Sequence, residues 1–373
     1  MSQFWGSHQY VSPTDPFKDR KSWSGTYYNT REALEKAGHQ VEWVSYTNWT
    51  KTDKFFAKVY KAIYGRKGSY IHSRLASHIR TRTIKQDLSK YDVLFVPGQV
   101  DIVAGLKTDT PIIYYTDGTV PLMVNYYWFG FTKKAIKEAE LVEQRAIDNA
   151  SYVWLSSKWA ADSVIKDYHA DPDQVSLFPF VVGNNDEQKI HVAKYDGQTL
   201  KVMFSGVDWE RKGGQYAVDA VETLNQRGIK SELLITGIRE LPEAVKSKKC
   251  VKNLGFLNKN EPEGLKKYLA TWQEANLLLL PTRAECSAIV FCEAAAYGAP
   301  VLTTETGGNS TYVKKKVNGD RLPLSASGEE FADVLEKWVK NGDLDRLSQG
   351  AEQMYRDYNS WKAWGDHFNQ VVH

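Results

Sequence analysis

The strongest constraint on the fold is a repeated alternation of short apolar runs with amphipathic helical stretches. Helical periodicity marks residues 28–39, 134–150, 215–228 and 328–342. Apolar runs punctuated by Gly, Pro or Asp predict strands at residues 39–46, 91–98, 111–117, 151–157, 175–180, 200–206, 231–237, 251–256, 275–281 and 300–305. Continuous apolar strands separated by helices are typical of parallel sheets covered on both faces, so the fold class is α/β.

The alternation pauses once, at residues 181–200, which are polar and lack periodicity. A chain of 373 residues also exceeds the usual size of one hydrophobic core. We therefore predict two Rossmann-like, doubly wound domains facing across a cleft, with ligands at the carboxyl ends of the strands. The boundaries are placed at residues 1–182 and 183–355. Residues 356–373 form a helix that either ends the second domain or crosses back to the first.

The composition argues against several classes of protein. The net charge is +3 and 42% of residues are hydrophobic, which indicates a globular chain. No apolar stretch of about 20 residues predicts a membrane span. The first ten residues lack a basic segment followed by an apolar one, and the three cysteines lack CxxC spacing. We expect a cytoplasmic protein without a disulfide framework or a metal site.

Two carboxylates, Glu285 and Glu293, are separated by seven uncharged residues after an apolar strand. Ser287 is expected to cap a helix over residues 288–297, which Gly298 ends. Glu285 then lies in a loop at the strand's carboxyl end and Glu293 two turns into the helix. Backbone N–H groups at the helix start suit a phosphate, and the two glutamates suit hydroxyls at either end of one ligand. The alternative is that both are solvated helix residues.

A second candidate is the stretch FSGVDWERKGG, in which a strand ends at Gly206 and a loop carries Arg211 and Lys212. Arginine offers a planar fork of donors and lysine a compact charge, and both suit a diphosphate. The alternative is a solvated charged loop. The stretch is not a Walker A loop, because GxxxxGK[ST] is absent.

The first half offers two further candidates. Gly25 and Thr26, in the sequence WSGT, precede an amphipathic helix. Asp117 directly follows a strand, where active-site residues gather in this architecture. The aromatic residues 126–129 either stack on a sugar face or fill the core.

Taken in order, these pieces resemble the retaining glycosyltransferases of family GT4, which have the GT-B fold. Glu285 and Glu293 look like the family's EX7E motif, and SGVDWERKGG looks like its diphosphate loop. WSGT takes the place of the Gly-rich first loop, TETGGNSTYV that of the GG segment, and VKNLGFLN that of the stretch lining the base. The resemblance implies that the tail from about residue 356 crosses back onto the first domain.

The resemblance also implies roles for single residues. Glu285 would contact the transferred sugar and Glu293 the ribose, while Arg211 and Lys212 would neutralise the diphosphate as its bond breaks. Glu285, Arg211, Lys212 and Asp117 are the expected catalytic residues. The expected donor-binding residues share a place around the nucleotide sugar: Gly25, Thr26, Gly206, Arg211, Lys212, Phe256, Leu257, Glu285, Ser287, Ala288, Ile289, Val290 and Glu293.

Three departures from the family pattern concern donor and acceptor more than reaction type. Many members have a histidine where this chain has Thr116-Asp117, and Asp117 is expected to orient the acceptor hydroxyl instead. The segment CSAIV replaces Gly-Phe-Gly after the first glutamate. Val207 stands where an arginine is usual, and Arg211 is expected to substitute for it.

Residues 51–90 carry 11 Lys or Arg and 2 Asp or Glu, mixed with Phe, Tyr and Ile. An anionic membrane surface is one expected partner, which would place the protein peripherally at the inner membrane face. A soluble basic cleft and a solvated helix face are the alternatives. Nucleic acid is not expected, because no binding module accompanies the charge.

The predicted function is a retaining hexosyltransferase. It would use a UDP- or GDP-sugar, a glycan, lipid-linked or protein acceptor, and no metal or other cofactor. Two alternatives stay open: a catalytically idle GT-B partner of another glycosyltransferase, and a sugar-nucleotide epimerase of the same fold.

Overall fold

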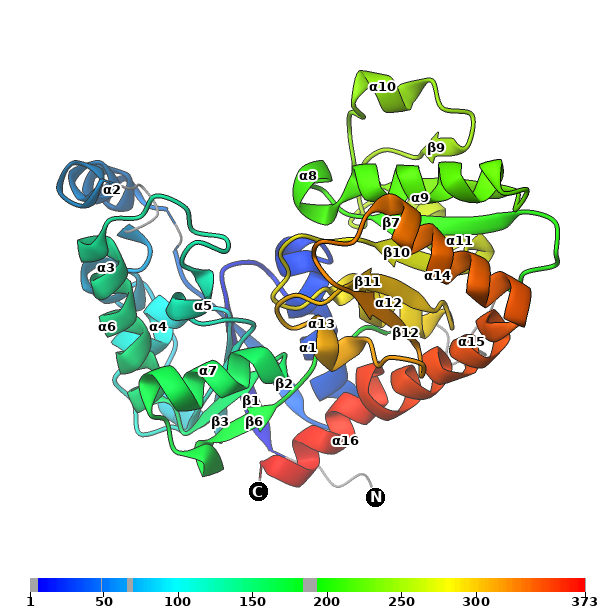
Figure 1. The fold of residues 1–373 in the computed structure, drawn as a ribbon. Coiled ribbons are helices and arrows are strands. Elements are labelled where there is room, and N and C mark those ends of the chain that lie inside the picture. The colour runs from blue at the N-terminus through cyan, green and yellow to red at the C-terminus, as the bar shows by residue number, and fades with distance from the viewer. Residues whose placement is uncertain (1–5, 48, 66–69, 184–192, 373) are drawn as a thin grey trace. The chain divides into compact units, whose positions relative to one another are not determined.

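A computed structural model describes residues 6–47, 49–65, 70–183 and 193–372 (Figure 1). The chain divides into two compact units: unit 1 comprises Met1–Pro179 with Gly365–His373, and unit 2 comprises Phe180–Trp364. Each unit is built on its own six-stranded sheet, in which every strand pair is parallel. The predicted α/β class with two doubly wound domains is confirmed.

The sheet of unit 1 has the order β2-β1-β3-β4-β5-β6, so the chain reverses its direction of travel beside β1. Its strands are β1 (Ser7–Ser12), β2 (Gln40–Ser45), β3 (Val93–Pro97), β4 (Ile112–Thr116), β5 (Tyr152–Leu155) and β6 (Val175–Leu177). Its helices are α1 (Thr26–Lys36), α2 (Lys51–Tyr64), α3 (Arg74–Thr81), α4 (Val100–Gly105), α5 (Val120–Met123), α6 (Lys133–Asn149) and α7 (Lys158–Tyr168). Every residue of β3 and β4 is buried, as the apolar runs predicted.

The sheet of unit 2 repeats the plan with the order β12-β11-β10-β7-β8-β9. Its strands are β7 (Leu200–Ser205), β8 (Ser231–Thr236), β9 (Val251–Asn253), β10 (Leu277–Leu280), β11 (Val301–Thr304) and β12 (Gly319–Leu322). Its helices are α8 (Trp209–Lys212), α9 (Gly214–Gln226), α10 (Glu243–Lys246), α11 (Pro262–Glu274), α12 (Ile289–Ala296), α13 (Asn309–Tyr312), α14 (Gly328–Asn341) and α15 (Asp343–Met354). A π-helical turn (Tyr355–Asn359) follows α15.

The last helix, α16 (Trp361–Val371), is divided between the units. Its residues up to Trp364 belong to unit 2, and those from Gly365 onward belong to unit 1. Phe368 is fully buried in unit 1, with its ring edge-on to the rings of His8, His39 and Trp154. Asn369 Oδ1 lies 2.6 Å from His39 Nε2, and His39 Nδ1 shares a 2.8 Å hydrogen bond with His8 Nε2. The end of α16 therefore forms part of the core of unit 1.

The unit boundaries differ from the predicted positions after residues 182 and 355. Unit 2 begins at Phe180, whose backbone N–H donates to Tyr312 Oη at 2.9 Å and whose carbonyl accepts from Asn359 Nδ2 at 3.1 Å. Residues 356–364 also stay with unit 2, because the Trp361 indole packs directly on Gly183. The return to unit 1 starts at Gly365. Of the expected linker, residues 184–192 lie outside the described residues.

Two properties of the described residues concern membrane spans and metal sites. None of the helices there is both long and apolar enough to cross a membrane. In the same part of the chain, no three His, Cys, Asp or Glu side chains are grouped so that they would hold a metal ion.

Candidate active site

The loop between β10 and α12 positions Glu285. The strand ends at Leu280, and α12 begins at Ile289 after an N-cap residue, Ala288, whose side chain offers no capping group. The expected cap by Ser287 is therefore wrong: its hydroxyl donates instead to the Cys286 carbonyl at 2.8 Å. The first N–H groups of the helix lack intrahelical partners, as in any α-helix. Ala288, Ile289 and Val290 are buried.

Glu285 is buried, with 6% of its surface exposed, and faces two cations from α8. Its carboxylate contacts the Lys212 ammonium directly and lies 3.7 Å from Arg211 Nη1. Arg211 also donates to the Ala284 carbonyl at 3.1 Å. Arg211 Nε also lies 3.6 Å from Asp208 Oδ2, so the guanidinium is shared between two carboxylates. The guanidinium and the ammonium are charged donors, which suit an anion.

The short helix α8 is held in place at both ends. The Asp208 side chain caps its start by accepting from the Arg211 N–H at 3.0 Å, and Gly213 ends it with φ of 74°. A Cβ atom at Gly213 would collide with the Pro281 carbonyl, and the Arg283 N–H donates to the Arg211 carbonyl at 2.6 Å. The end of β10 thus fixes the backbone that carries both cations.

Gly206, the last predicted member of this loop, has a steric reason to be glycine. It lies at the carboxyl end of β7, and the Lys212 stem packs across it so closely that a Cβ atom would lie 2.8 Å from Lys212 Cγ. Gly308 of the GG segment donates its N–H to the Glu285 carbonyl at 3.2 Å. The structure therefore brings Gly206, Arg211, Lys212, Glu285 and the GG segment together.

Glu293 lies on α12 and is held by two donors that the sequence did not single out. Tyr268 Oη on α11 donates to Glu293 Oε2 at 2.7 Å, and Lys259 Nζ donates to Oε1 at 2.8 Å. The Lys259 ammonium also lies 5.0 Å from the centre of the Tyr268 ring. Burial, followed by the Glu293 carboxylate, raises the pKa of the Tyr268 phenol well above its ordinary value, so the phenol keeps its proton.

A cavity of about 410 Å³ opens at the carboxyl ends of β7 and β8. Phe256 belongs to its lining and Leu257 does not. The Arg239 guanidinium lies 4.8 Å from the centre of the Phe256 ring. The lining residues are Val207, Trp209, Gly237, Ile238, Arg239, Glu240 and Phe256. An exposed aromatic face next to an arginine is suited to a flat heterocycle.

The remaining predicted residues belong to unit 1. Gly25 is the N-cap of α1 with φ of 88°, and a Cβ atom there would lie 2.9 Å from the Arg20 carbonyl oxygen. The Thr26 hydroxyl donates to the Trp23 carbonyl at 2.7 Å. Asp117 follows β4 and is partly buried. The burial of Tyr27 is the main cause of the raised pKa of its phenol, and the negative charge of the Asp117 carboxylate is the second cause. Gly25, Thr26 and Asp117 therefore all lie at the carboxyl edge of this sheet.

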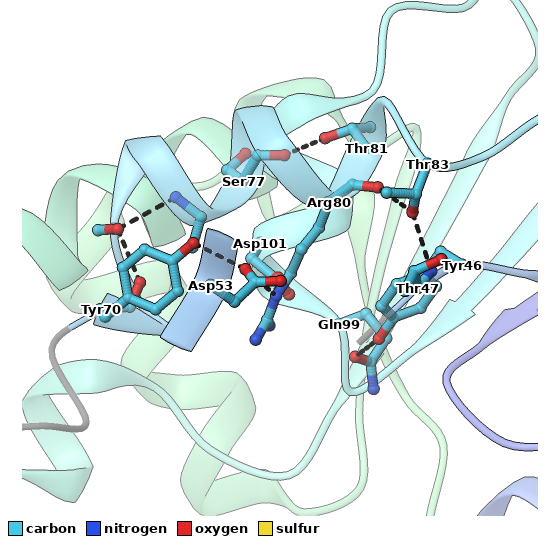
Figure 2. A network of polar contacts seen from close by, with 12 residues as sticks. Tyr46, Thr47, Asp53, Tyr70, Ser77, Arg80, Thr81, Thr83, Gln99 and Asp101 are labelled. Atoms are coloured by element: carbon cyan, nitrogen blue, oxygen red, sulfur yellow. Dashed lines mark hydrogen bonds and ion pairs between the residues drawn. The ribbon is translucent and has the colours of Figure 1, made fainter. Parts of the chain in front are cut away.

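A buried polar network lies at the same edge, and the sequence pattern does not reveal it (Figure 2). Arg80 on α3 is 3% exposed and donates through Nη1 to Asp101 Oδ2 at 2.8 Å, while its Nε lies 3.7 Å from Asp53 Oδ1. Tyr70 Oη donates to the same Asp53 oxygen at 2.7 Å. Arg80 belongs to the basic block of residues 51–90, yet its charge is paired inside unit 1. Residues 66–69 of that block lie outside the described residues.

The aromatic residues near Asp117 divide between exposure and packing. The Trp128 ring lies 4.5 Å from that of His72 and stacks on Phe131 at 5.2 Å, whereas Phe129 is 60% exposed. No single role as a sugar platform or as core describes this stretch.

Comparison with known proteins agrees with this architecture. Residues 199–341, which contain both glutamates and α8, match the family described as Glycosyl transferases group 1. A D-inositol 3-phosphate glycosyltransferase of Arthrobacter sp. (strain FB24) is 25% identical over 301 residues, which cover 74% of this chain and 70% of that protein. A second one, from Corynebacterium efficiens, is 24% identical over 301 residues, covering 74% and 69%.

Solved structures share the fold at low sequence identity. Sucrose-phosphate synthase from Thermosynechococcus elongatus has a TM-score of 0.66 at 16% identity, with 98% of both chains covered. Anabaena Alr3699/HepE in complex with UDP-glucose has a TM-score of 0.62 at 12% identity, with 98% of this chain and 99% of that chain covered. These findings confirm the resemblance to GT4 at the level of family and fold, and they do not favour an idle partner or an epimerase. The chain is a glycosyltransferase of the GT-B fold, and its second unit carries the glycosyl transferases group 1 domain.

Proposed function

We propose that the enzyme moves a hexosyl unit from a UDP- or GDP-sugar to a glycan, lipid-linked or protein acceptor with retention of configuration. The observation that carries the proposal is the cluster of the half-buried Arg211 with the buried Lys212 and Glu285, which lies inside the group 1 domain. The Arg211 guanidinium and the Lys212 ammonium are suited to a diphosphate, and Glu285 beside them is suited to sugar hydroxyls. Alr3699/HepE, which shares the fold, was crystallised with UDP-glucose.

The proposed reaction exchanges one bond at the anomeric carbon for another. The bond to the diphosphate oxygen breaks, and the acceptor hydroxyl oxygen forms the new bond on the same face. The departing phosphate oxygen takes the acceptor proton. Arg211 and Lys212 stabilise the negative charge that develops on the diphosphate, which is the task a metal ion performs in other transferases. We therefore propose that no metal is needed.

The other residues would bind the rest of the donor. Glu293 would accept from the ribose hydroxyls, and the backbone N–H groups at the start of α12 would meet a phosphate. The cavity at Phe256 would hold the base, with Leu257 adjoining it outside the lining. In unit 1, Gly25 and Thr26 would approach the diphosphate by their backbone, and Asp117 would orient the acceptor hydroxyl.

The test measures donor hydrolysis without acceptor across UDP-, GDP-, ADP- and TDP-sugars. We expect one donor to be hydrolysed slowly, and Lys212→Met to lower kcat for it by about 100-fold or more. Glu285→Gln should also lower the rate. Lys248→Met removes a lysine that pairs with Glu222 elsewhere in unit 2, and it should leave the rate unchanged. If no donor is turned over, or if Lys212→Met matches the wild type, the proposed function is wrong.

We also propose that the outer face of α2 docks on an anionic membrane, which suits a lipid-linked acceptor. Lys51, Lys54, Lys58 and Lys61 are all exposed along this helix. Phe55 and Ile63 are 62% and 53% exposed beside them. Phe56 and Ala57, on the inner side, belong to a small cluster around Tyr70. A cationic stripe next to exposed apolar side chains is typical of helices that lie in a membrane interface.

Vesicle sedimentation tests this docking surface. Vesicles containing phosphatidylglycerol should sediment the protein, vesicles of phosphatidylcholine should sediment much less, and about 0.5 M salt should weaken the binding. The double variant Phe55→Ser/Ile63→Ser should lose most of the binding. Leu141→Ser, which changes an exposed apolar residue of α6, is the matched control. Equal binding of the double variant and this control would remove α2 as the docking face.

A further inference from the structure

Glu293 is positioned by three elements at once. Its own helix, α12, supplies the carboxylate, α11 supplies the Tyr268 hydroxyl, and the loop before α11 supplies the Lys259 ammonium. The Ser205 hydroxyl, at the end of β7, lies 3.5 Å from the Tyr268 hydroxyl. A lone glutamate on a helix surface needs none of these contacts, so the arrangement points to a defined orientation of the carboxylate.

Counting acceptor sites shows what the two donors leave available. An ionised carboxylate offers about four lone-pair sites, two on each oxygen. Lys259 uses one site on Oε1, and Tyr268 uses one site on Oε2. One site on each oxygen remains. Two acceptor sites on one carboxylate match the two hydroxyls of a vicinal diol, and the ribose 2′- and 3′-hydroxyls form such a diol.

Burial makes this orientation firm. The side chain of Glu293 is 14% exposed, that of Lys259 is 23% exposed, and Tyr268 as a whole is 7% exposed. The ammonium of Lys259 over the Tyr268 ring adds a cation–π contact, so the three side chains fix one another. A carboxylate with this support has little freedom to turn, whereas an unsupported glutamate samples many rotamers.

We propose that Tyr268 and Lys259 are positioning residues that hold the Glu293 carboxylate ready for both ribose hydroxyls of the donor. They make the enzyme selective for ribonucleotides over nucleotides that lack the diol. The inference rests on the proposed function, in which Glu293 meets the ribose. It adds two residues that neither the family motif nor the sequence pattern had assigned.

The test compares two ligands on the same protein. Isothermal titration calorimetry gives Kd for UDP and for 2′,3′-dideoxy-UDP, and the same pair is measured for GDP. We expect the wild type to prefer the ribonucleotide by about tenfold or more. Tyr268→Phe and Lys259→Met should each reduce that preference about fivefold while leaving the Kd of the dideoxynucleotide unchanged. Lys259→Arg should keep part of the preference.

Matched controls separate positioning from damage to the fold. Tyr358→Phe changes an exposed tyrosine of unit 2, and Lys248→Met changes an ion-paired lysine of the same unit. Both should bind like the wild type. A partly unfolded variant would bind both nucleotides more weakly by the same factor, so the ratio of the two Kd values reports positioning alone.

The outcomes distinguish the two proposals. If Glu293→Gln loses the preference but Tyr268→Phe and Lys259→Met retain it, the positioning role is wrong and the proposed function stands. The positioning role also fails if both variants weaken the two nucleotides equally. If the wild type does not discriminate between the nucleotides, or binds neither pair, then the ribose role of Glu293 fails and this inference fails with it.

Discussion

Glu143 is a carboxyl group that this fold keeps away from water. It is 4% exposed on α6, and its Oε2 accepts from the Val120 N–H at 2.6 Å and from the Tyr168 hydroxyl. No cation is among these partners, so burial is the leading influence on the group. Burial raises the pKa of Glu143 from 4.5 to about 7.

The free energy of unfolding should therefore depend on pH through the protonation of Glu143. Between about pH 4.5 and pH 7 the folded state holds a proton that the unfolded chain has released, so the free energy of unfolding falls as pH rises. Glu143→Gln keeps an oxygen acceptor and cannot ionise. The unfolding free energy of the wild type minus that of the variant should fall by about 3 kcal/mol across this window and stay level above it.

Urea unfolding at a series of pH values measures this difference. Subtracting the unfolding free energy of the variant from that of the wild type cancels the contributions of other titrating groups. One of these is His72, whose pKa is lowered to about 4 by burial, so that it makes the free energy of unfolding rise with pH. Asp162→Asn, at an exposed carboxylate of α7, is the control and should give no such difference. Parallel curves for wild type and Glu143→Gln would contradict the expectation.

At the scale of elements, the junction of α8 and α9 carries both cations of the cluster, Arg211 and Lys212. Gly213 serves as C-cap of one helix and N-cap of the next, and its backbone lies against the Pro281 carbonyl. Any side chain at this position meets two costs, the left-handed backbone conformation and the collision with the end of β10.

We expect Gly213→Ala to lower the free energy of unfolding by about 3 kcal/mol and to reduce donor turnover. Gly228→Ala is the matched control, because Gly228 has φ of 83° but no atom within 4 Å of the place that a Cβ atom would take. The control should lose only about 1 kcal/mol. Thermal or urea unfolding of both variants measures the pair. An equal loss in both would mean that the contact with Pro281 does not constrain α8.

Most strands of the two sheets were predicted from the sequence, but two were not. All ten strands expected from apolar runs are present, but β1 and β12 were not among them. In β1 the buried residues His8 and Gln9 each make one hydrogen bond, through Nε2, to a distant partner, His39 and the Asp87 carbonyl, which no local pattern reveals. The edge strand β12 is short and polar, and it is recognised only by its pairing with β11.

The sequence likewise predicted some residues of the candidate site and missed others. The strand ends and the motif spacing predicted Glu285, Arg211 and Lys212, and the structure brings them into one cluster. Tyr268 was missed because it lies 25 residues before Glu293 on another helix, and a tyrosine in a helical pattern looks like core. Contacts between side chains of separate elements are tertiary information, which a single sequence does not carry locally.

At the scale of the whole molecule, the fold class and the order of motifs followed from the sequence, whereas the unit boundaries depended on packing. The indole of Trp361 against Gly183 keeps the start of α16 with unit 2, and the ring of Phe368 takes its end into unit 1. Periodicity treats α16 as one amphipathic helix. It cannot show that two cores share it.

The burial of Phe368 also bears on how the protein is made. Unit 1 needs residues from Gly365 onward, yet a ribosome synthesises these only after it has produced every residue of unit 2. Until then, the nascent chain exposes the rings of Trp154 and Phe178, against which α16 will pack. The unit that is translated first is therefore completed last, so chaperones have the longest time to act on this half of the enzyme.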